Sequence, residues 1–308
     1  MLILVVLGFF VALLAPQLGW INSYVEHVLI MVGVNVILCA SLNLVNGYMG
    51  EFSIGHAGFM SLGAYTSAIV TTKILPSLPG PAVFLPAIVA GGIVAAVIGF
   101  FLALLSFNTR GDYLAIITLA FLMIVKSGFE NLPFVGGPRG VLGIRHLTTL
   151  GWTFACVVIT LWSIRNLIYS KFGRAVVAIR EDEIAANAMA VRTREAKILA
   201  FVVSSFFAGI AGALFAHQIL FINPSTFDIV KSTEILVMVY LGGIGSLSGS
   251  LLGAVIFTFL SEILQPLGTW RMVILSLLLV LLMLFRPKGI FGMRELKIFI
   301  PRREWKEK

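Results

Sequence analysis

The sequence has 308 residues, of which 59% are hydrophobic and only 12% are charged. Because soluble domains carry about 25% charged residues, this composition excludes an ordinary soluble protein and indicates a chain that spans a membrane several times. The formal net charge of +8 does not indicate nucleic-acid binding, since the basic residues are few and lie beside apolar blocks, as they do in membrane proteins.

The apolar blocks predict an all-α polytopic membrane protein that forms a single domain over residues 1–308. A helix needs about 20 apolar residues to cross about 30 Å of hydrocarbon, and by this measure we expect about ten transmembrane helices. The first block lacks a basic leader and a small-residue cleavage site, so it predicts a retained span rather than a signal peptide. The spans are predicted at 2–20, 28–46, 54–72, 83–106, 112–129, 152–169, 198–220, 229–242, 246–263 and 269–285.

Two basic clusters set the predicted orientation. Seven Lys and Arg side chains lie between residues 165 and 197, and eight lie in the basic tail at 286–308. Since basic loops stay on the cytoplasmic side of a membrane, an even number of spans must separate the clusters, and the apolar stretch between them fits four. Counting back through six further spans places the N- and C-termini in the cytoplasm.

Small residues recur at four-residue spacing in several spans. They let helix backbones approach closely in lipid, where no hydrophobic force draws helices together. Tight packing explains these stripes, and the alternative is that some of the helices move against one another. The predicted packing residues are Gly245, Gly249 and Gly253 in one stripe, Ala208 and Gly212 in a second with Gly209 beside it, and Gly91 in a third.

Polar side chains inside spans are candidates for a substrate path, because burial in hydrocarbon makes them costly. His56, Lys126 and Glu234 lie deepest in the predicted spans. Plainer explanations exist, since Lys231 lies one helical turn from Glu234 and is placed to pair with it. Judged by polarity, the candidate path consists of Ser53, His56, Ser61, Tyr65, Lys126 and Glu234.

The sequence predicts no cofactor in this chain. It has no GxxxxGK[ST] phosphate loop and no HExxH or GxSxG motif, and His56 lacks a second ligand for a metal site. An intramembrane enzyme is disfavoured, because no nucleophile–base or metal constellation is present.

One segment interrupts the apolar pattern with a dense block of charge, GRAVVAIREDEIAANAMAVRTREAKILAF at 173–201. We expect a helix there that starts with the acidic residues 181–183, since acidic side chains favour the positive helix end. Ile184, Ala188 and Val191 would follow on one apolar edge. A short helix with small and charged side chains is suited to docking another protein, and the alternative is an ordinary basic loop.

This segment resembles the cytoplasmic EAA loop of ABC importer permeases, and its wording is similar to the branched-chain amino-acid permease family, in particular to LivM-like subunits. The resemblance covers nearly the whole chain. It is carried by SIGHAGFMSLGAYTSAI at 53–69, RGDYLAIITLAF at 110–121, VGGPRGV at 135–141, FAGIAGALFAH at 207–217 and EILVMVYLGGIGSLSGSLLGA at 234–254.

The resemblance implies the permease subunit of an ABC importer in the bacterial inner membrane. Such a subunit pairs with a homologous sister permease, two cytoplasmic ATPases that bind ATP and Mg, and a periplasmic binding protein, and it transports by alternating access. The loop at 170–197 would dock into an ATPase as a coupling helix. The coupling residues that the resemblance marks are Gly173, Arg174, Arg180, Glu181, Asp182, Glu183, Ala185, Ala186 and Ala190.

The resemblance leaves two points open. Ala190 stands where the family usually has glycine, which puts the bend at that position in doubt. Relatives move leucine, isoleucine and valine, whereas others move urea, short amides or aromatic compounds. A rival from another class is an ion-coupled secondary transporter, in which Lys126 and Glu234 are coupling residues at the middle of the membrane.

Overall fold

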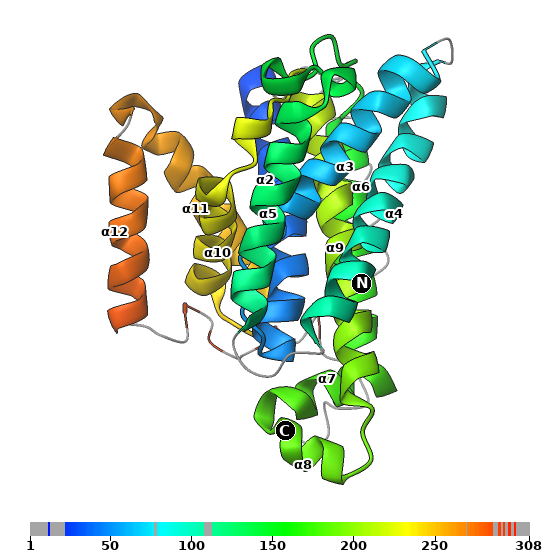
Figure 1. The fold of residues 1–308 in the computed structure, drawn as a ribbon. Coiled ribbons are helices and arrows are strands. Elements are labelled where there is room, and N and C mark those ends of the chain that lie inside the picture. Colours follow the sequence, from blue (N-terminus) through cyan, green and yellow to red (C-terminus); the bar gives the residue numbers. More distant parts are fainter. Residues whose placement is uncertain are drawn as a thin grey trace.

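The computed structural model is a bundle of helices that run between two common ends (Figure 1). It describes residues 22–76, 79–107, 113–268 and 270–285, together with Ala12 and six positions near the C-terminus (289–290, 292, 295–296 and 299). The first predicted span, 2–20, lies outside the described residues apart from Ala12, and so does most of the basic tail at 286–308.

Each of the other nine predicted spans coincides with a helix, which confirms an all-α polytopic fold for the described residues. Two of the helices, α2 and α3, are prolonged by π-helical turns, η1 (Leu44–Met49) and η2 (Val70–Ile74). The helices are α2 (Ser23–Asn43), α3 (His56–Ile69), α4 (Gly80–Ser106), α5 (Tyr113–Asn131), α6 (Leu150–Ile168), α9 (Thr193–Ile219), α10 (Ile229–Gly242), α11 (Leu247–Ile263) and α12 (Trp270–Phe285).

Within the described residues, five segments are long and apolar enough to cross a membrane by themselves, namely Ser23–Met49, Gly80–Ser106, Tyr113–Asn131, Leu150–Ile168 and Thr193–Ile219. The remaining helices are shorter. At 1.5 Å per residue, the 14 residues of α10 rise roughly 21 Å and the 16 residues of α12 roughly 24 Å. Polar and interfacial residues at their ends must therefore cover the rest of the hydrocarbon thickness.

Contacts between loops define the two ends of the bundle. One end, called the α8 end below, carries two short helices, α7 (Lys171–Glu181) and α8 (Glu183–Ala188), which lie below the bundle in Figure 1. Glu295 of the C-terminal segment accepts hydrogen bonds there from Tyr48 Oη (2.5 Å) and from the Leu247 amide (2.6 Å). The charged loop and the described part of the tail therefore lie at the same end, as the charge pattern predicts.

The opposite end is held together by a second set of polar contacts. Tyr24 donates to Glu262 at 3.2 Å, and Lys73 donates to the Phe134 carbonyl. Val141 and Ile222 form a single β-bridge between two loops, with the Val141 amide 2.8 Å from the Ile222 carbonyl oxygen.

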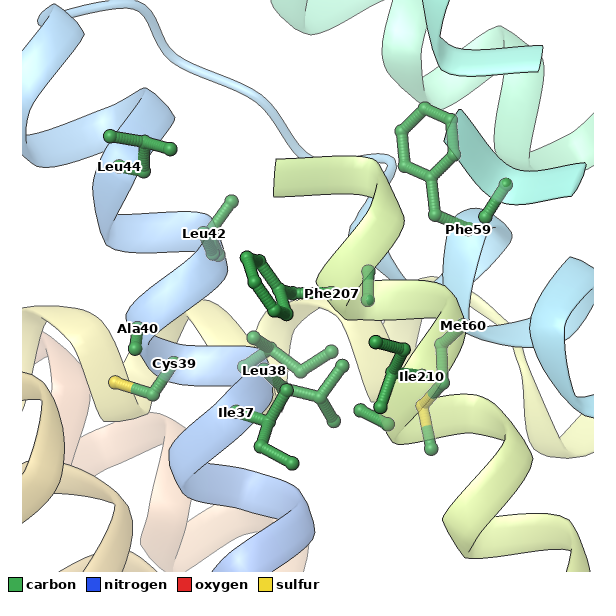
Figure 2. Packing of buried hydrophobic residues seen from close by; sticks show 14 of the residues in the cluster. Ile37, Leu38, Cys39, Ala40, Leu42, Leu44, Phe59, Met60, Phe207 and Ile210 are labelled. Carbon is green, nitrogen blue, oxygen red and sulfur yellow. The ribbon is translucent and has the colours of Figure 1, made fainter. Parts of the chain in front are cut away.

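Helices α2, α3 and α9 are largely buried and form the core of the bundle. Figure 2 shows Phe207 and Ile210 of α9 between Leu38 of α2 on one side and Met60 of α3 on the other. All four side chains are buried in one apolar cluster. Because α2 is surrounded by protein on nearly all sides, its sequence is apolar all round rather than amphipathic.

Helices α3, α4 and α9 meet at three glycines whose backbones are in contact. A Cβ atom added to Gly209 would lie 2.6 Å from the Gly91 carbonyl oxygen and 2.7 Å from the Ala95 Cβ. A Cβ at Gly91 would lie 2.8 Å from the Gly63 carbonyl oxygen, and one at Gly63 would overlap the Gly209 backbone. We call Gly63, Gly91 and Gly209 the glycine triad.

Two small residues of α9, Ala208 and Gly212, lie beside the triad, and Gly212 faces α3. Ala208 is fully buried, and a Cβ at Gly212 would overlap the Met60 carbonyl oxygen and lie 3.0 Å from the Ala64 amide nitrogen. Close approach of two helices without side chains between them is a common way to pack helices in lipid.

The predicted stripe at the start of α11 is wrong at its first member. Gly249 and Gly253 lie in α11 and face the backbone of Gly242 in α10, but Gly245 lies in the turn before α11 with φ +76°. The turn forms because the buried Asn43 side chain bonds it: Asn43 Oδ1 accepts from the Gly245 amide at 2.9 Å and Asn43 Nδ2 donates to the Ser246 carbonyl at 2.8 Å.

Candidate functional site

A helix, α8, starts at the acidic residues, as the sequence predicts, but it ends at Ala188 and a separate helix, α7, precedes it. Helix α7 ends at Glu181, and Asp182 adopts an extended conformation (φ −162°, ψ 110°). The Asp182 carboxylate then accepts hydrogen bonds from the amides of Ile184 (2.8 Å) and Ala185 (3.0 Å) and caps the start of α8. A short acidic side chain that bonds nearby amides favours a new helix start over a helix interior.

Glu181 lies at the end of α7, whereas the sequence predicted it at the start of a helix. Gly173 lies buried in the first turn of α7. A side chain would not fit there, because a Cβ would overlap the Leu167 and Ile168 carbonyl oxygens. Arg174 is exposed on the same turn. The glycine thus lets α7 leave α6 at close range.

Ala190 ends α8 in a left-handed conformation, with φ 59°. The chain turns back there: the Ala190 amide donates to the Asn187 carbonyl at 3.0 Å, and the Val191 amide donates to the Ala186 carbonyl at 3.1 Å. Glycine adopts this conformation without strain, whereas an L-residue with a Cβ loses roughly 1–2 kcal/mol. The bend is therefore made with alanine, at a conformational cost.

The apolar edge predicted from Ile184, Ala188 and Val191 is wrong in its last member, because α8 ends at Ala188. Ile184 is 82% exposed, Ala188 is exposed and Val191 lies beyond the end of α8. Ala186 is the buried residue of α8 and packs toward the bundle. Ile184 and Met189, which is 80% exposed, project away from it together with the exposed Ala185.

Charged side chains meet between α8 and the bundle, at a junction that the sequence analysis did not identify as a site. Lys197, in the first turns of α9, has its Nζ 2.6 Å from Glu51 Oε1 and 2.9 Å from Glu183 Oε2. Arg180 Nη1 donates to the Gly47 carbonyl at 3.2 Å, and Arg180 Nη2 pairs with Glu181 at 2.5 Å. The sequence signal for this junction was Lys197, a lysine directly before a predicted span. Such a lysine also fits the ordinary excess of basic residues in cytoplasmic loops.

The predicted path residues on and before α3 are all buried. Ser53 donates its amide to Asn46 Oδ1 at 3.1 Å, and Ser61 donates to the Gly58 carbonyl within its own helix at 2.7 Å. His56 Nε2 lies 2.8 Å from Ser41 Oγ of α2. The Ser41 carbonyl in turn accepts from Ser204 of α9 at 2.6 Å, so His56 lies at a polar contact between three helices.

Tyr65 lies farther along α3, toward the opposite end. Its ring stacks on Phe129 of α5 with a centroid distance of 4.0 Å and lies 6.3 Å from the Phe227 ring. Its hydroxyl is buried and has no hydrogen-bond partner among the described residues.

Lys126 and Glu234 come from two other helices, α5 and α10. Lys126 is half-buried on α5, one turn before Glu130. Glu234 Oε2 lies 3.0 Å from Lys231 Nζ, as the spacing predicted, and Glu234 Oε1 lies 3.8 Å from Arg271. The hydrogen bonds and ion pairs described above join none of the six candidate path residues to another. No group of three His, Cys, Asp or Glu side chains in the described part of the chain is placed to hold a metal ion.

Comparison with known proteins identifies the same family along most of the chain. The model of the family described as "Branched-chain amino acid transport system / permease component" matches residues 24–285. The Escherichia coli branched-chain permease LivM is 31% identical over 92% of this chain and 75% of its own length. A probable LivM of Methanocaldococcus jannaschii is 25% identical over 86% and 92%, and E. coli LivH is 31% identical over 42% of each chain.

Proposed function

Because the chain belongs to the permease family of branched-chain amino acid transport systems, we propose that it is the transmembrane subunit of an ATP-driven ABC importer in the bacterial inner membrane. Its substrates are leucine, isoleucine, valine or other hydrophobic amino acids. It works with a homologous sister permease, two cytoplasmic ABC ATPases and a periplasmic binding protein. The chain itself is a permease and not an enzyme.

The observation that carries this proposal is the surface of α8. The helix stands outside the bundle, and it presents Ile184 and Met189 almost fully to the surroundings. Large apolar side chains exposed on a charged loop mark sites where another protein binds. Ala185 lies between them and leaves room for a partner to approach closely.

The mechanism follows from the position of α8 at one end of the bundle. ATP binding closes the ATPase pair, the groove that holds α8 moves, and the helices reorient around a central path between the two permeases. The α8 end is then the cytoplasmic end, and both termini lie there. The charge pattern supports this orientation, because seven basic residues lie between 165 and 197.

The family favours a hydrophobic amino acid as the substrate, because the relatives named above belong to branched-chain amino acid systems. Urea, short amides and aromatic compounds are the alternative substrates. An ion-coupled transporter is less well supported, since Glu234 is paired with Lys231 and Arg271.

The proposal is tested by co-expressing the tagged chain with its genomic neighbours and purifying it in detergent. We expect an ATPase and a second permease to co-purify, and we expect Ile184→Asp to remove the ATPase. Reversal of Glu183 is a less specific test, because that side chain also bonds Lys197. Leu142→Asp is the matched control, since Leu142 is 72% exposed in a loop at the opposite end.

Two results would contradict the proposal. One is recovery of the chain without an ATPase. The other is uptake by the purified chain alone in proteoliposomes, driven by an ion gradient and independent of ATP.

A further inference from the structure

Lys197 is a buried cation whose two carboxylate partners come from different parts of the chain. Its side chain is 8% exposed, with Glu51 Oε1 at 2.6 Å and Glu183 Oε2 at 2.9 Å. Glu51 belongs to segment 50–55, which joins η1 to α3, and Glu183 is the first residue of α8. Because a buried charge is stable only when it is paired, the Lys197 ammonium holds both segments against the start of α9.

Arg180 makes a second tie between the same two regions. Its guanidinium donates to the Gly47 carbonyl at 3.2 Å, and a Cβ added to Gly50 would lie 2.6 Å from the Arg180 Cγ. Residues 47–51 are therefore held by two basic side chains, one from α7 and one from α9, on the side that faces the coupling loop.

Segment 50–55 continues from these ties into the bundle. The Ile54 amide donates to Thr118 Oγ1 of α5 at 3.1 Å, and the Ile54 carbonyl accepts from Ser232 of α10. Helix α3 begins directly after the segment, at His56. A displacement of α8 that keeps its ion pair therefore moves a segment that is bonded to α5 and α10 and leads into α3.

We propose that Lys197 is a positioning residue for transport, which links the coupling helix α8 to segment 50–55 and so passes its movement to α3, α5 and α10. The inference rests on the proposed function and adds the route by which α8 acts on the bundle. Loss of the link leaves α8 free to dock and to follow the ATPases, while the transmembrane helices no longer follow α8.

The test compares uptake with ATP hydrolysis in the intact complex. The wild-type chain and Lys197→Met are co-expressed with the genomic neighbours, purified and reconstituted in proteoliposomes with leucine and the binding protein. In Lys197→Met we expect the ATPase to co-purify and hydrolyse ATP, and uptake per ATP hydrolysed to fall about tenfold, within the usual range of coupling between two sites. Lys197→Arg keeps the charge and should retain most of the ratio.

Arg192→Met is the matched control. Arg192 forms an exposed pair with Glu195 at 3.3 Å in the same loop, so its loss should leave uptake per ATP unchanged. A double-mutant comparison adds a sharper test. Glu51→Gln should lower the ratio by itself and should have no further effect when combined with Lys197→Met.

The possible results separate as follows. A wild-type ratio in Lys197→Met, or a parallel fall of uptake and hydrolysis, overturns the link. If Lys197→Met does not reach the membrane, Glu51→Gln, which leaves Lys197 paired with Glu183, decides by the same ratio. A wild-type complex without ATP-dependent uptake overturns the proposed function itself, and this result is seen before any variant is compared.

Discussion

The glycine triad makes a strong prediction about stability, which the substitution Gly209→Ala tests. Gly209 lies on α9 opposite α4, and the added methyl group would meet the Gly91 carbonyl oxygen at 2.6 Å, the Ala95 Cβ at 2.7 Å and the Gly92 Cα at 3.0 Å. None of these three atoms belongs to a flexible side chain. The helices must therefore separate to admit the methyl group.

The expected cost follows from two opposing terms. Overpacking of a tight interface costs about 1–3 kcal/mol, and a gap of roughly 0.5–1 Å forfeits a quarter to a half of each dispersion contact nearby. Replacing a helical glycine by alanine returns about 1 kcal/mol. We expect a net loss of about 1–2 kcal/mol, which at this chain length lowers the melting temperature by about 2–4 °C.

The assay is thermal unfolding of the purified protein in detergent, followed by tryptophan fluorescence. Gly128→Ala is the matched control, because no atom lies within 4 Å of a Cβ at that position of α5. The control should raise the melting temperature slightly. The reasoning fails if Gly209→Ala is as stable as the unsubstituted chain, or if both substitutions destabilise it equally.

Two further predictions concern the end of α8 and the ion pair of Glu234. Ala190→Gly should stabilise the end of α8, because glycine removes the strain of the left-handed conformation, about 1–2 kcal/mol, at a chain-entropy cost of about 0.5–1 kcal/mol. Hydrogen exchange of the Val191 amide should slow about two- to fivefold, whereas the control Ala188→Gly should speed it. Faster exchange in Ala190→Gly would contradict the strain at this position. Glu234→Gln should leave ATP-dependent uptake within about twofold of the unsubstituted complex, since partly exposed ion pairs such as Glu234–Lys231 contribute about 1 kcal/mol or less to stability. Abolished uptake in a fully assembled complex would instead support a coupling role for Glu234.

The sequence predicted the spans well because each apolar block is much longer than the error of a few residues with which its boundaries can be located. Charge clustering also placed the charged loop at 170–197 and the tail at one end, and the Glu295 contacts confirm this for the described part of the tail. Helix α2 illustrates why helix boundaries are harder to predict. It is prolonged by the π-helical turn η1, which the periodicity of the apolar residues does not indicate.

The sequence predicted a helix start at residues 181–183 but missed the separate helix α7 that ends there. A single side chain, Asp182, ends one helix and caps the next through two hydrogen bonds. Capping by aspartate is visible in a sequence only when the residues before it are already known to leave the helix.

The Lys197 junction could not be predicted from one sequence for a different reason. Glu51 is 146 residues away from Lys197 along the chain, and their pairing depends on how the α2–α3 junction packs against α9. Spacing rules describe neighbours within a helix or a hairpin, and they carry no information about such distant pairs. The candidate path residues share this limit, since polarity alone did not separate His56 from Glu234.

The glycine triad also has a mechanical consequence. Side chains at an interface can change rotamers and let two helices slide, but three backbones in direct contact have no such adjustable layer between them. Helices α3, α4 and α9 should therefore tilt as one rigid block during the transport cycle.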